Sequence, residues 1–118
     1  MRAAVLGVLG ITVVLLAACD ARSVGAARSP SFECKGELTT VERVICSHHD
    51  LAALDVDMAA AYRDALAKAP TLEARKALHT EQARWRGRRN ECEAHDPMQA
   101  CIAAQYKARI AQLRPDGA

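Results

Sequence analysis

Apolar residues between positions 40 and 113 recur at steps of three and four, which is the spacing of one face of an α-helix. The clearest stripe follows Asp50 and ends before Pro70, and its members are Leu51, Leu54, Met58, Tyr62, Ala65 and Leu66. Outside an apolar run at the N-terminus, no segment carries a strand signal. The pattern therefore predicts an all-α fold.

Helix-capping signals divide this region into helices. A short first helix is predicted after Thr39, because Thr39 and Glu42 have the spacing of a capping box. Asp50 is expected to cap the second helix. Thr71, directly after Pro70, is expected to cap a third helix that runs to about Cys92.

The third helix and a fourth form a predicted helical hairpin. Asp96 is expected to be the N-cap of the fourth helix, with Pro97 at its first position and Gln99 completing a capping-box spacing. Cys92 and Cys101 stand on either side of the bend. The sequence thus predicts one small domain of four helices that packs around this hairpin.

The N-terminal apolar run is interpreted as a targeting segment, because residues 3–18 carry no charge and follow a single arginine. It ends in Leu16-Ala17-Ala18-Cys19, which resembles a bacterial lipobox and implies cleavage before Cys19 with lipid attached to that residue. The alternative is ordinary secretion with cleavage near Ala26. The predicted segments are a lipoprotein signal peptide (1–18), a flexible tether (19–31) and a helical domain (32–114).

Four cysteines remain after Cys19, and they are Cys34, Cys46, Cys92 and Cys101. An even number in a small exported domain predicts two disulfides, each contributing about 2–3 kcal/mol. Three pairings are possible, and Cys34–Cys46 with Cys92–Cys101 is favoured because each pair flanks a local turn. Cys92 and His95 also have a metal-ligand spacing, but thiols in an oxidising compartment pair with each other first. We expect no metal and no cofactor.

Charge argues against a nucleic-acid partner. Without residues 1–18 the chain has 15 basic and 14 acidic residues, a near balance. The balance hides an asymmetry: residues 33–64 contain seven acids and three bases, whereas residues 65–114 contain five acids and ten bases. The sequence predicts an acidic part and a basic part if the fold keeps these segments apart.

Two groups of residues carry a family resemblance. The first group is Phe32-x-Cys34, Thr40-x-Glu42-x-x-Ile45-Cys46, Leu51-x-x-Leu54-Asp55 and Tyr62. The second is Gln82-x-x-Trp85, Arg89-x-x-Cys92, Cys101-Ile102, Tyr106, Arg109 and Leu113. In this order they resemble the lysozyme-inhibitor LprI-like domain, although Ser47-His48-His49-Asp50 stands where that family often has an Asp-Pro step. The resemblance implies a helical, exported or lipid-anchored bacterial domain, and some members of the family inhibit lysozyme.

Three charged positions fall within that pattern: Asp55, Arg89 and Arg109. We interpret them as a structural ion-pair network that ties the second helix to the hairpin, because an arginine makes a forked bond to a carboxylate where helices cross. The alternative is a set of charges that faces a partner.

No catalytic constellation is evident, so the chain is not expected to be an enzyme. The favoured hypothesis is an inhibitor anchored in the bacterial cell envelope that blocks the lysozyme cleft, where two carboxylates act. Basic or hydrogen-bonding side chains in the turns are the candidates for contact with lysozyme: Lys35, His48, His49 and His95. The alternative is an envelope interaction or scaffold lipoprotein whose arginines at positions 84–89 meet another protein or an anionic lipid.

Overall fold

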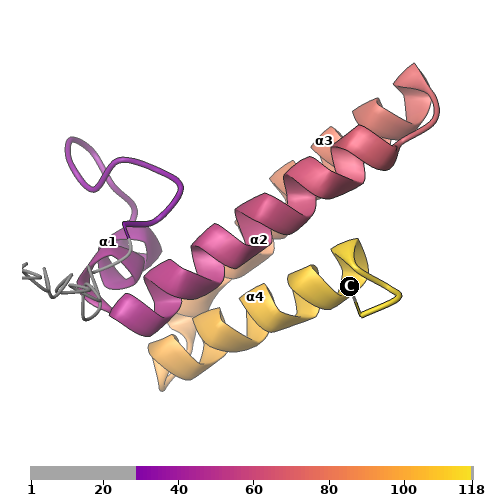
Figure 1. Ribbon diagram of the computed structural model, residues 1–118. Helices are drawn as coiled ribbons and strands as arrows, with labels where there is room; N and C mark the ends of the chain where they lie inside the picture. The colour runs from indigo at the N-terminus through magenta and orange to yellow at the C-terminus, as the bar shows by residue number, and fades with distance from the viewer. Residues whose placement is uncertain (1–28, 118) are drawn as a thin grey trace, which may run out of the picture.

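The computed structural model describes residues 29–117, and every regular element in that range is helical (Figure 1). The all-α prediction is confirmed. The elements are α1 (Thr40–Ser47), α2 (His49–Lys68), α3 (Leu72–Asn90), a 3₁₀ turn η1 (Glu91–Ala94) and α4 (Met98–Leu113). The predicted signal peptide, Cys19 and most of the predicted tether lie outside the described residues.

Three long helices form the body of the molecule. Figure 1 shows α2 and α3 as a hairpin whose tip is the turn at Pro70, with α4 lying alongside α2. The short α1 packs at the opposite end from this tip, against α2, α3 and η1. None of the helices within residues 40–113 is long and apolar enough to cross a membrane.

Two of the predicted helix starts are confirmed. The Thr39 hydroxyl accepts from the Glu42 N–H at 3.2 Å, and the Glu42 carboxylate accepts from the Thr39 N–H at 2.8 Å, which completes the capping box of α1. The Thr71 hydroxyl accepts from the Ala74 N–H at 3.0 Å and caps α3. These side chains satisfy amide groups that the first helical turn leaves free.

The other two caps were predicted wrongly. Helix α2 begins two residues earlier, with His48 rather than Asp50 at the N-cap, so Asp50 lies inside the first turn. Helix α4 begins at Met98, because Pro97 takes the extended N-cap conformation in place of Asp96. Proline has no side-chain acceptor, so α4 begins without a side-chain cap.

The core lies where the helices cross near α1. One cluster of buried residues joins all five elements: Val41, Ile45, Leu51, Met58, Trp85, Cys92, Ile102 and Tyr106. Trp85 is 2% exposed and its indole N–H donates to the Gln105 carbonyl at 3.1 Å. Burying a large apolar side chain stabilises the fold by about 1.5–3 kcal/mol. Trp85 is therefore a core residue.

Both disulfides have the favoured pairing. Cys34 is bonded to Cys46, with Cα atoms 5.8 Å apart, and Cys92 is bonded to Cys101, with Cα atoms 5.6 Å apart. The first links the N-terminal segment to α1, and the second links η1 to the first turn of α4.

Replacing Cys92 and Cys101 together by serine should lower the free energy of unfolding by about 3 kcal/mol, because the bond closes a short loop that the unfolded chain would otherwise open. Urea unfolding of the oxidised proteins measures this. In a strong reductant the wild type and the variant should converge. An unchanged urea midpoint under oxidising conditions would contradict the prediction.

Candidate functional site

The N-terminal segment, α1, η1 and the turn before α4 meet at one end of the bundle (Figure 1). We call this region, residues 29–50 and 90–101, the disulfide end, because it contains both disulfides. The Thr40 hydroxyl donates to the Glu93 carboxylate at 2.7 Å and adds a link between α1 and η1. The turns at this end are therefore held by covalent bonds as well as by packing.

Three of the four residues predicted to contact a partner are exposed here. Lys35, His49 and His95 all lie at the disulfide end with exposed side chains. The Lys35 ammonium is 3.6 Å from the Glu33 carboxylate, and both groups are largely in solvent. One ring nitrogen of His95 is 3.1 Å from the Glu91 carbonyl. These side chains remain accessible to another molecule.

His48 is placed differently. It is half-buried, with Nδ1 at 2.8 Å from the Val44 carbonyl and 3.0 Å from the Ser47 hydroxyl. Its Nε2 meets the side-chain amide of Gln99. His48 therefore connects the α1–α2 junction to α4, and it engages the glutamine that was expected in a capping box.

The disulfide end is acidic. Within the described residues it carries seven acidic and two basic side chains, whereas the rest of the bundle carries six acidic and eleven basic ones. The acids at this end are Glu33, Glu37, Glu42, Asp50, Glu91, Glu93 and Asp96. The last three come from the predicted basic half of the sequence. The fold therefore sharpens the charge separation that the sequence predicted.

A buried polar network lies directly behind this end. The Asp55 carboxylate, 1% exposed, accepts from the Tyr106 hydroxyl at 2.8 Å and from the Ser31 N–H at 2.5 Å. The Arg89 guanidinium donates to the same hydroxyl at 3.1 Å. Asp55 on α2 and Arg89 on α3 are thus joined through a tyrosine of α4. Ser31, which was assigned to the tether, is fixed to this network through its backbone.

Arg89 is held by further contacts. Its Nε and Nη2 donate to the Asn90 side chain at 3.1 and 2.9 Å, and Nη2 is 3.8 Å from the Glu42 carboxylate. Its guanidinium carbon lies 5.6 Å from the centre of the Trp85 ring, a cation–π distance. Burial raises the pKa of Tyr106, so its hydroxyl stays protonated at neutral pH and donates to the carboxylate.

Arg109 belongs to a separate group. It is buried, its Nε donates to the Gln82 side chain at 3.0 Å, and its Nη1 is 3.3 Å from the Gln112 side-chain oxygen. Its Nη1 is also 4.0 Å from the Glu81 carboxylate. The structure thus brings Asp55 and Arg89 together and places Arg109 beside a different set of partners.

Sequence reasoning did not assign Tyr106 and Gln82 polar roles. Both stand at helical spacing among apolar residues, so periodicity marked them as inward-facing without indicating a hydrogen bond. The signal that could have identified them is a tyrosine and a glutamine on the buried face of a helix, since buried polar groups need partners. Within residues 29–117 no three His, Cys, Asp or Glu side chains gather as a metal site.

Comparison with known proteins decides the family. The family model described as "Lysozyme inhibitor LprI" matches residues 33–113, which include both disulfides, the side chains of the buried network and the exposed Lys35, His49 and His95. The chain belongs to the LprI family of lysozyme inhibitors.

Relatives of the chain include the lipoprotein LprI of Mycobacterium bovis and that of Mycobacterium tuberculosis. Each is 30% identical over 112 residues, which are 92% of this chain and 54% of the relative. The chain therefore spans about half the length of these LprI proteins. No solved structure matches it significantly.

Replacing Tyr106 by phenylalanine should lower the free energy of unfolding by about 2–3 kcal/mol at neutral pH, because the buried Asp55 and Arg89 both lose a partner. The difference in unfolding free energy between wild type and variant should shrink above about pH 10. There Tyr106 ionises in the unfolded wild type but stays protonated in the folded one, which favours unfolding. The variant has no hydroxyl at this position and does not lose stability in this way. Urea unfolding across that range measures it. Tyr62→Phe is the control, and a deficit that stays constant above pH 10 would contradict the account.

Proposed function

We propose that this chain inhibits lysozyme by docking its disulfide end into the glycosidase cleft. The observation that carries the proposal is an acidic end, clamped by two disulfides, in a chain of the LprI family. The family indicates inhibition of lysozyme, and the charge and rigidity of this end make it the surface best suited to dock.

Charge complementarity supports this surface. Common lysozymes are strongly basic, and the disulfide end carries seven acids against two bases within the described residues. Complementary potentials raise the rate of encounter and orient the two proteins before contact. The remaining surface, with its excess of arginine and lysine, would be repelled by the same enzyme.

Exposed basic side chains on this end suit the cleft itself. A lysozyme cleft contains two carboxylates that flank the bond to be cut. Lys35, His49 or His95 could place a hydrogen-bond donor between them, and His95 stands in the turn closed by the Cys92–Cys101 bond. A turn that is already ordered loses less conformational entropy on binding.

The proposed location is the bacterial cell envelope. The relatives are lipoproteins by name, and the sequence at Leu16–Cys19 resembles a lipobox. We propose that Cys19 carries a lipid, and that residues 19–28 connect this anchor to Ser31, where the domain begins at its bond with Asp55. Anchoring would hold the inhibitor where lysozyme reaches the cell wall.

The oxidised protein should inhibit lysozyme in a cell-wall lysis assay, and Lys35→Ala with His95→Ala should weaken inhibition about tenfold, the effect expected for losing contacts near the centre of an interface. His79→Ala is the matched control, since His79 is an exposed histidine on α3 away from the disulfide end. The association rate should also fall as salt is added.

A purified protein that leaves several lysozymes fully active at micromolar excess would reject the proposal. Inhibition lost equally in the His79 control would reject the disulfide end as the docking surface. Binding to membranes that depends on the arginines at positions 84, 86 and 88, without any effect on lysozyme, would favour the scaffold alternative.

Cells that express the full chain should attach a palmitate analogue to it, and Cys19→Ala should abolish the label while the protein is still exported. Labelled protein should sediment with membranes, and the variant should be released. Absence of label on the wild type would instead support cleavage near Ala26 and a secreted protein without a lipid.

A further inference from the structure

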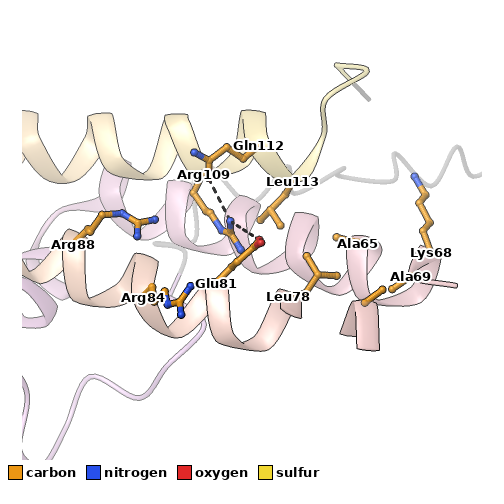
Figure 2. A pocket seen from close by; sticks show the side chains of 11 residues that line it. Ala65, Lys68, Ala69, Leu78, Glu81, Arg84, Arg88, Arg109, Gln112 and Leu113 are labelled. Carbon is orange, nitrogen blue, oxygen red and sulfur yellow. Dashed lines mark hydrogen bonds and ion pairs between the residues drawn. The ribbon is translucent and has the colours of Figure 1, made fainter. Parts of the chain in front are cut away.

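A second surface lies away from the disulfide end, in an open groove of about 650 Å³ lined by residues of α2, α3 and α4 (Figure 2). Toward the hairpin tip its lining includes the apolar side chains of Ala65, Ala69 and Leu78, with Lys68 at the same end. Toward the other end it is lined by Arg84 and Arg88 of α3 and by Arg109 of α4. The groove therefore has an arginine-rich end and an apolar stretch toward the hairpin tip, where Lys68 adds one more cation.

The buried Arg109 side chain is incompletely satisfied. Its Nη2 has no hydrogen-bond partner and its side chain is 4% exposed. Its Nη1 has only long contacts, 3.3 Å to Gln112 and 4.0 Å to Glu81. A buried guanidinium normally uses all its N–H groups, since an unpaired buried donor is costly. The guanidinium edge of Arg109 formed by Nη1 and Nη2 therefore lacks a close hydrogen-bond acceptor.

Positive charge exceeds negative charge in this groove. Burial lowers the pKa of Arg109, and the neighbouring charge of Arg88 lowers it further, while Glu81 opposes both. Glu81 is the one acid in the groove lining, and its side chain is 57% exposed. Figure 2 shows Glu81 reaching toward Arg109 from α3. An exposed glutamate at 4.0 Å is a weak counter-ion that another carboxylate can replace.

We propose that this groove binds an amphiphile with a carboxylate head and an apolar tail. The head takes the Nη1–Nη2 edge of Arg109 in a forked bond, with Arg88 and Arg84 beside it, and Glu81 turns outward to solvent. The tail lies over the alanines and Leu78 toward the hairpin tip. A planar carboxylate can accept two parallel hydrogen bonds from the guanidinium group. Contact with the apolar lining removes the tail from water, which favours binding.

Decanoate, below its micelle concentration, is the probe, and calorimetry on the exported, disulfide-bonded protein is the measurement. Arg88→Gln should weaken decanoate binding about tenfold. Glu81→Gln should strengthen it about threefold, because the Glu81 carboxylate no longer competes with the ligand for Arg109. Arg86→Gln is the matched control, since Arg86 is an exposed arginine of α3 outside the groove lining. Acetate and octyl glucoside, which carry the head or a tail alone, should each bind far more weakly.

Decanoate binding that is unchanged in Arg88→Gln and Glu81→Gln would overturn the proposal, because the probe would then lie elsewhere on the chain. Inorganic phosphate binding as tightly as decanoate would overturn the role of the tail, and octyl glucoside binding as tightly would overturn the role of the head. The measurement does not involve lysozyme, so its outcome is independent of the docking proposed for the disulfide end.

Discussion

The Tyr106 hydroxyl is the contact on which the arrangement of the helices depends. It donates to Asp55 of α2 and accepts from Arg89 of α3, while its own ring belongs to α4. A hydroxyl both donates and accepts, so it suits a position between a buried carboxylate and a buried guanidinium. Removing any one member leaves a buried charge with fewer partners, which is costly in a core with few other polar groups. The three long helices are therefore joined through one shared hydroxyl.

The segments outside the three long helices attach to the same point. The Ser31 N–H donates to Asp55, and Glu42 of α1 lies 3.8 Å from Arg89. The Trp85 and Tyr106 rings pack in an edge-to-face arrangement, with ring centres 5.2 Å apart. Because the network lies behind the disulfide end, it supports the turns that the two disulfides close. The groove beside Arg109 is lined in part by the small side chains of Ala65, Ala69 and Ala74.

The features that were predicted correctly from the sequence are those that depend on neighbouring residues in the chain. The helical spacing, the caps at Thr39 and Thr71 and the two short disulfide loops all depend on residues close together in the chain, and all three are confirmed. The caps predicted at Asp50 and Asp96 were wrong because the helix starts depend on the conformation of neighbouring residues. His48 and Pro97 have extended backbones, so each helix begins directly after a residue that provides no side-chain cap. Long-range partners carry no local signal. Asp55 and Tyr106 are 51 residues apart, so their bond could not be derived from spacing.

The distribution of charge gives a nearly neutral domain the acidic surface that the proposed docking to a basic lysozyme requires. Residues 29–117 contain equal numbers of acidic and basic side chains, so the net charge alone predicts no attraction. Salt screens charges beyond about 8–10 Å, so an approaching protein responds to the surface that it meets rather than to the total. Folding brings Glu91, Glu93 and Asp96 to the same end as the acids of the N-terminal segment, and it places Arg84, Arg88 and Arg109 around the groove. One small domain thus presents two surfaces of opposite charge, and each suits a different kind of partner.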